Sequence, residues 1–133
     1  MKLPEAYLAV AERSLKAAKV LLDESIQESA TFYSYHAFES MGGALCESQG
    51  VRYHPRGHPQ KINLFTTVAR KLGIGKGVAT VAIIVASMRN GCLYPNLSSG
   101  GSFETPETRT SKSAARDILK RVKGIYKIVK KML

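Results

Sequence analysis

The C-terminal segment of the 133-residue chain carries two stripes of side chains that only a helix can separate. Apolar residues recur at steps of three and four, and a basic series runs two residues out of phase with them. Two residues correspond to about 200° of rotation around an α-helix, so the stripes lie on opposite sides. The segment is therefore predicted to be an amphipathic helix. Its apolar stripe is Ala115, Ile118, Val122, Ile125, Val129 and Met132, and its basic stripe is Lys112, Arg116, Lys120, Lys123, Lys127 and Lys130.

Helical spacing of apolar residues also predicts three helices in the first part of the chain. Ser29 is expected to cap the second of them, and Gly50 to stop it. Gly42 and Gly43 lie within this second helix and predict a close approach of another element. A loop rich in Pro and Gly, residues 51–60, precedes the third helix. The three predicted helices cover residues 4–25, 29–48 and 60–72.

The most apolar run, residues 77–90, is ambiguous because its β-branched residues also favour a strand. No second convincing strand exists in the sequence, and a lone strand leaves its backbone groups unpaired. The run is therefore predicted to be a buried helix. "GIGKG", residues 73–77, is a helix–helix break and lacks a full phosphate-loop motif, and residues 95–108 form a polar loop, expected to be mobile. The expectation is an all-α, five-helix bundle with one domain over residues 1–133.

Charge is distributed unevenly along the chain. Residues 1–50 have a balance of −3 and residues 51–133 a balance of +13, which suggests an anionic partner such as nucleic acid or nucleotide. A soluble basic surface gives the same pattern. Cys46 and Cys92 lie far apart, so no disulfide is predicted, and His54 with His58 lacks further ligands for a metal. With no signal peptide or membrane span, a cytoplasmic protein without cofactor is expected.

Three patterns in their order resemble the HEPN domain family (higher eukaryotes and prokaryotes nucleotide-binding). The first is "FYSYHAFESMGGALCESQG", residues 32–50, in which Glu39 matches the glutamate of the family's second helix and His36 precedes it by one turn. The second is the His-containing loop that leads into "HPQKINLFTTVARKL". The third is "MRNGCLYP", in which Arg89 and Asn90 end the buried helix. The resemblance covers about residues 5–133.

The resemblance implies an up-and-down helical bundle that forms a homodimer. Many active members of the family are metal-independent ribonucleases with an Arg followed, after four to six residues, by a His, and the two motifs face each other across the dimer. Many small prokaryotic members act with a minimal nucleotidyltransferase as a toxin–antitoxin pair. Tyr94 occupies the position of the His in this chain, and a phenol with an unperturbed pKa of about 10 is a poor base. The departure at Tyr94 therefore favours binding without cleavage.

For several residues, the sequence alone allows two interpretations. Arg89 either binds phosphate or forms a buried ion pair with Glu39. Tyr94 either stacks on a base or closes the bundle, and His36 is either a core histidine or a partner of Arg89. Arg52 and His58 also satisfy the Arg-to-His spacing, and this pair is interpreted as a chance match. The basic stripe is either a solvated face or a recognition surface.

The predicted function is therefore binding of nucleotide or RNA, together with a minimal nucleotidyltransferase as partner. An active ribonuclease toxin and a purely structural subunit are the alternatives. The candidate catalytic residues are Arg89, Tyr94 and His36, Glu39 is a structural polar residue, and no metal site is predicted. The candidate binding residues are Arg89, Asn90, Tyr94, Lys112, Arg116, Lys120 and Lys123.

Overall fold

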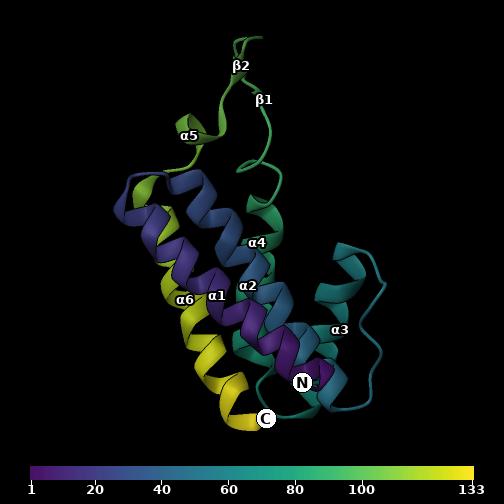
Figure 1. Ribbon diagram of the computed structural model, residues 1–133. Helices are drawn as coiled ribbons and strands as arrows, with labels where there is room; N and C mark the ends of the chain where they lie inside the picture. Colours follow the sequence, from purple (N-terminus) through teal and green to yellow (C-terminus); the bar gives the residue numbers. More distant parts are fainter.

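The computed structural model describes residues 1–133 as a bundle of long helices with a small hairpin at one end (Figure 1). The all-helical prediction is confirmed, including the helix in the β-branched run. The number of helices is six rather than the predicted five, because a single helical turn, α5, adds one. The helices are α1 (Leu3–Asp23), α2 (Gln27–Ser48), α3 (His58–Lys71), α4 (Gly75–Met88), α5 (Pro106–Arg109) and α6 (Lys112–Met132), and the strands are β1 (Asn96–Leu97) and β2 (Phe103–Glu104).

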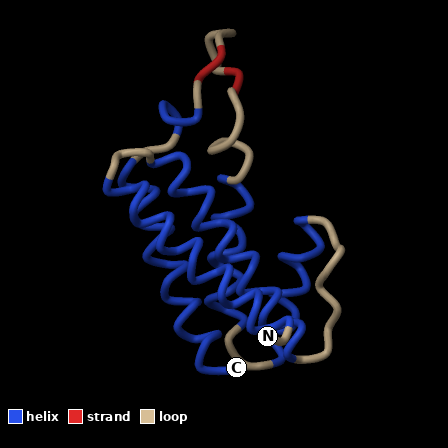
Figure 2. The backbone as a smooth tube through the Cα atoms, viewed as in Figure 1, coloured by secondary structure: helices blue, strands red, loops and turns tan.

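One connection departs from an up-and-down arrangement. The loop after α2 runs back along the side of the bundle, so α3 starts beside the middle of α2 and proceeds in the same direction (Figures 1 and 2). Side-chain contacts fix this direction, since His58 meets Glu39 and the ring of Phe65 lies 4.9 Å from that of Phe38. The N-terminus of α3 is thereby placed near the C-terminal end of α4.

Helix α2 lies at the centre of the core. It packs against α1, α3 and α6, and fourteen of its residues are buried. Val78, Val81 and Val85 of α4 face this core, where α3 and α6 cover them. The apolar run therefore gains burial as a helix without needing a strand partner, whereas the only β-structure is the two-residue pairing of β1 with β2.

Two details of the predicted segments are wrong. Ser29 does not cap α2, because the helix begins two residues earlier, and Ile26 occupies the N-cap position without a side-chain hydrogen bond. Ser25, with a φ of 63°, makes the turn that brings the chain from α1 into α2. The polar loop at 95–108 contains the β1–β2 hairpin and α5 rather than coil alone. Gly50 does end α2, with a φ of 73° directly after the C-cap.

The paired glycines of α2 permit the predicted close packing. A Cβ on Gly42 would lie 2.7 Å from the Phe65 ring and 2.9 Å from the Tyr53 hydroxyl, and one on Gly43 would lie 2.7 Å from the Tyr7 ring. The rings beside Gly42 cannot move freely, because Tyr53 and Phe65 are fully buried. Both glycines therefore form part of the seam along which α2 meets α1, α3 and the loop before α3.

We expect Gly42→Ala to lower the free energy of unfolding by about 1–3 kcal/mol, because the added methyl group overpacks the core. Gly124→Ala is the matched control. Gly124 is also a helical glycine, but a Cβ there would meet no atom within 4 Å, so this substitution should stabilise the protein by about 0.5–1 kcal/mol. Urea unfolding followed by circular dichroism measures both values. Equal effects of the two substitutions would contradict the packing argument.

Candidate functional site

Glu39 is the centre of a polar cluster that joins α2 to α3. Only 8% of its side chain is exposed, and its Oε2 atom accepts a hydrogen bond of 2.6 Å from the Tyr35 hydroxyl. The same oxygen lies 2.7 Å from His58 Nδ1, while Lys61 Nζ lies 3.5 Å from Oε1. Tyr35 and Glu39 are one helical turn apart on α2, and His58 and Lys61 are one turn apart on α3. The carboxylate is therefore held by two donors and one cation.

These contacts determine the charge of the cluster. Burial alone would raise the pKa of Glu39, but hydrogen bonds from Tyr35 and His58 and the charge of Lys61 outweigh it and lower the pKa. The pKa of the Tyr35 phenol is raised, first by burial and then by the hydrogen bond to Glu39. At neutral pH the cluster therefore contains a carboxylate and a protonated phenol.

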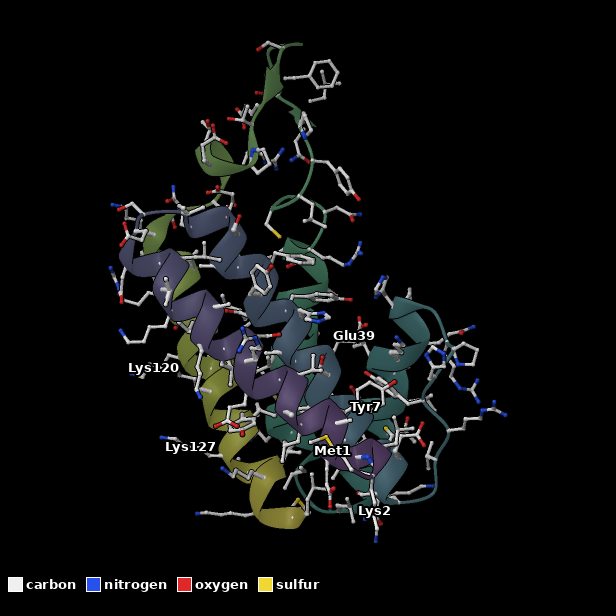
Figure 3. The ribbon with its side chains drawn as sticks, viewed as in Figure 1. Met1, Lys2, Tyr7, Glu39, Lys120 and Lys127 are labelled. Carbon is white, nitrogen blue, oxygen red and sulfur yellow. The ribbon has the colours of Figure 1, made fainter.

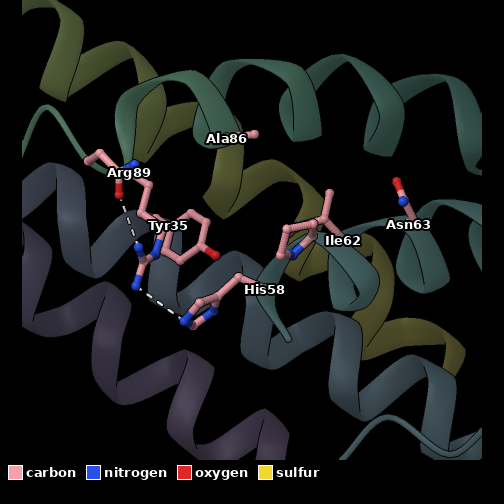
Figure 4. Close-up of a pocket in the computed structure, with 8 residues that line it drawn as sticks. Tyr35, His58, Ile62, Asn63, Ala86 and Arg89 are labelled. Atoms are coloured by element: carbon pink, nitrogen blue, oxygen red, sulfur yellow. Dashed lines mark hydrogen bonds between the residues drawn. The ribbon is translucent and has the colours of Figure 1, made fainter. Parts of the chain in front are cut away.

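His58 connects Glu39 to Arg89. Its Nε2 atom lies 3.2 Å from Arg89 Nη2 (Figure 4). A guanidinium group only donates hydrogen bonds, so Nε2 accepts this one, and the Nδ1–H group donates to Glu39. The contacts thus select one neutral tautomer of His58, in which a lone pair points towards the guanidinium and the carboxylate orients the ring.

Arg89 occupies the C-cap position of α4, where the buried helix ends. Its guanidinium carbon lies 5.5 Å from the centre of the Tyr35 ring, and Nη1 donates to Asn90 Oδ1 at 3.2 Å. The Nε–H group is buried and has no hydrogen-bond partner. Arg89 is therefore positioned by an aromatic face, a histidine and an amide, and each of its two Nη groups carries a second N–H donor.

A cavity of about 360 Å³ opens between α2, α3 and α4 at this cluster. Asn90 lines it, and the Arg89 guanidinium lies beside Tyr35 and His58 (Figure 4). A cation, an amide and an imidazole at the mouth of an open cavity suit an anionic group such as a phosphate. No three His, Cys, Asp or Glu side chains come together as a set of metal ligands. The complete lining is Tyr35, His58, Pro59, Ile62, Asn63, Ala86, Arg89 and Asn90.

The structure brings some of the predicted site residues together and separates others. Arg89 and Asn90 share the cavity, whereas Tyr94 is 58% exposed, makes no side-chain hydrogen bond and does not line it. His36 stacks on Phe32, with ring centres 6.2 Å apart, and makes no hydrogen bond to Arg89. The direct ion pair with Glu39 that was one of the two alternatives for Arg89 is not formed, because His58 lies between the two groups.

The four basic candidates lie on another part of the surface. Lys112, Arg116, Lys120 and Lys123 belong to α6, which packs against α1, α2 and α4. Figure 3 shows Lys120 and Lys127 projecting from the edge of the bundle away from α3, whereas Glu39 lies towards α3. None of the α6 cations lines the cavity beside Arg89.

Three members of the cluster are absent from the residues selected by sequence. His58 satisfies the Arg-to-His spacing with Arg52, but in the structure its partner is Arg89, 31 residues further along the chain. Tyr35 and Lys61 have no signal of their own. Only their positions in the sequence could have indicated a role in the site. His58 is the first residue of the helix that follows the loop, and Tyr35 lies one turn before Glu39.

The comparisons with known proteins concern the whole chain. The sequence profile of the HEPN domain family matches residues 4–132. No curated protein matches the chain. The crystal structure of TT1696 from Thermus thermophilus has a TM-score of 0.84 and 17% identity, with 100% of both chains covered. That of ST0689, an archaeal HEPN homologue, has a TM-score of 0.70 and 21% identity, with 99% of this chain and 98% of the other covered. At these identities, the two structures show a shared fold.

Proposed function

The chain belongs to the HEPN domain family, and on this basis we propose that it binds a nucleotide or RNA through the cavity between α2, α3 and α4. The observation that carries the proposal is the contact of Arg89 with His58 at the mouth of this cavity. The two Nη groups of the guanidinium, which meet Asn90 and His58, offer planar donors that match a phosphate. A phosphate that enters takes over the Arg89 donors now shared with His58 and Asn90.

A second candidate is metal-independent cleavage of RNA, which the Glu39–His58 contact favours. Once a phosphate has engaged Arg89, the lone pair of His58 Nε2 is free to accept the proton of a 2′-hydroxyl group. The 2′-oxygen then bonds to phosphorus while the bond to the 5′-oxygen breaks, and water supplies the proton that the leaving oxygen needs. Glu39 holds the required tautomer, and Arg89 stabilises the charge on the phosphate. His58 thus offers a base that Tyr94 does not.

We also propose a homodimer, which the exposed face of α4 supports. Ile83 is 74% exposed, and Ala86 and Asn90 follow it on the same side of the helix, where both border the cavity. A second copy packed on this face brings two cavities together. From the family resemblance we further propose a minimal nucleotidyltransferase as partner in a toxin–antitoxin-like system, which the identity of the adjacent gene tests.

A third candidate assigns the cluster a purely structural role. If neither nucleotide nor RNA binds, the remaining interpretation is a structural subunit in which the cluster only joins α2, α3 and α4.

None of the six helices has both the length and the apolar character that are needed to cross a membrane.

We expect His58→Gln to weaken binding of a single-stranded uridine oligomer by several-fold, because Arg89 loses the side chain that orients it. His54→Gln is the matched control, since His54 is exposed and makes no side-chain hydrogen bond. Fluorescence anisotropy in EDTA measures both affinities. Unchanged affinity in His58→Gln would remove His58 from the binding site.

Gel analysis of the same samples tests the second candidate. Cleavage by the wild type that is lost roughly 10²–10⁴-fold in His58→Gln and kept in His54→Gln would establish a ribonuclease. RNA that stays intact while it is bound would leave the protein as a binding protein.

A further inference from the structure

A basic groove runs between α1 and α6, on the side of the bundle away from α3. Two adjoining cavities of about 490 and 560 Å³ form it, and they share Lys19, Lys123 and Lys127 as lining residues. We define the basic groove by the lysines that border it from both helices, which are Lys16, Lys19, Lys120, Lys123, Lys127 and Lys130. Lys16 and Lys19 belong to α1, in the part of the sequence with a negative charge balance, residues 1–50. They extend the basic stripe of α6, although the periodicity of α6 does not predict them.

The positive charge of the groove is almost uncompensated. Glu12 and Asp23 are the only acidic residues that line it, and Asp23 is already paired with Lys19 at 3.1 Å. The one acid of α6, Asp117, pairs with Arg121 outside the groove. The α6 lysines therefore form no salt bridge and repel one another, which favours an anionic ligand between the two helices.

Gly124 provides an independent observation in the same place. It lies inside α6 and lines the groove, and a Cβ added to it would meet no atom within 4 Å. Glycine weakens a helix relative to alanine, and here no neighbour in the chain requires its small size. A glycine at this exposed position leaves the α6 side of the groove open to a ligand that approaches the helix backbone.

We propose that the basic groove is a second anion-binding site, separate from the Arg89 cavity, and that it binds the phosphate backbone of RNA independently of sequence. From Arg116 to Lys130, α6 rises by about 21 Å, which corresponds to roughly six phosphates along one strand. Lysine is a flexible point charge that neutralises phosphates without reading bases. Lysine is also depleted from the cores of protein–protein interfaces, so the groove fits a nucleic acid better than an acidic protein.

The test compares two triple variants with the same change in net charge. One carries Lys120→Glu, Lys123→Glu and Lys127→Glu in the groove, and the control carries Lys2→Glu, Lys71→Glu and Lys76→Glu outside it. Binding of a uridine oligomer of about 20 nucleotides is measured between about 50 and 200 mM NaCl. In the groove variant, the slope of log K against log salt should become shallower by roughly 2. Its affinity at the lowest salt should fall roughly a hundredfold. Both changes should be much smaller in the control. Equal losses in both variants would overturn the proposal.

A neutral substitution separates the groove from net charge. Gly124→Gln adds a good helix former, so it should fold at least as well as the wild type, while its side chain narrows the groove from the α6 side and weakens RNA binding several-fold. Unchanged RNA binding would count against the groove. Polyglutamate that competes for the groove more strongly than the RNA would replace the proposal with an acidic protein partner. Arg89→Gln leaves the groove intact and should keep the salt slope to within about 1, so failure at one site is distinguishable from failure at the other.

Discussion

Replacing Arg89 with Gln is expected to weaken the binding of a nucleotide or short RNA by about 1–3 kcal/mol, a rise of roughly 5- to 150-fold in Kd. Gln keeps a polar side chain but removes the charge and the planar set of donors that meets His58, Asn90 and the ligand. Isothermal titration calorimetry with a dinucleotide measures the effect at the cavity, because so short a ligand gains little from the basic groove.

Arg13→Gln is the matched control for this loss. Arg13 is an exposed arginine of α1 that lines neither the cavity nor the basic groove, and the substitution removes the same charge. Binding should be almost unchanged in this variant. If Arg89→Gln binds as tightly as the wild type, the cavity is not the binding site, and Arg89 has only a structural role.

The second large effect concerns stability. Glu39→Ala is expected to lower the free energy of unfolding by about 3–5 kcal/mol, because it removes the one acceptor shared by Tyr35, His58 and Lys61. Lys61 is most affected, since its side chain is only 18% exposed and loses its only anionic partner. Urea unfolding at neutral pH measures the change. Glu47→Ala is the control, because Glu47 also lies on α2 and accepts a single hydrogen bond, from the Tyr53 N–H group.

The contribution of Glu39 to stability should depend on pH, because the pKa of its carboxyl group is lowered in the folded protein. A carboxyl group whose folded-state pKa is depressed stabilises the protein above its unfolded pKa, which is about 4.3 for Glu. The contribution is lost as the pH falls through the lower, folded-state pKa. The stability difference between the wild type and Glu39→Gln should therefore be full near neutral pH and shrink below about pH 4. A difference that does not change over this range would contradict the role of the ionised carboxylate.

Much of the fold can be predicted from local patterns. The stripes of α6, the glycine stop at Gly50 and the three motifs that resemble the HEPN domain each depend on neighbours in sequence, and the family assignment and the helices are confirmed. The β-branched run is predicted to be a helix by elimination, since no strand partner is available. The small elements at 95–109 escape prediction, because a two-residue strand pair and a single helical turn have no periodicity that a sequence pattern can show.

The site is harder to predict because its contacts are not local. Arg89 is identifiable because a charge ends an apolar run, which is a local signal. Its partner His58 lies 31 residues away, and Glu39 lies a further 19 before His58. The linear motif points to Tyr94, which is close in sequence but exposed in the structure. Which histidine meets Arg89 depends on the direction of α3, which is tied to a long-range contact of the preceding loop, because Tyr53 is fully buried and donates to the Glu39 carbonyl, 14 residues earlier.

The parallel course of α2 and α3 also places the N-terminus of a helix at the cavity. A helix carries roughly half a positive charge at its N-terminus and half a negative charge at its C-terminus. Because α3 begins at the cavity, its positive pole faces the same space as the Arg89 guanidinium, while the negative pole of α4 stabilises the Arg89 cation. Had α3 run antiparallel to α2, its carbonyl end would face an incoming phosphate and repel it. The return of the loop along the bundle thus adds a positive helix pole to the charge of Arg89 at this cavity.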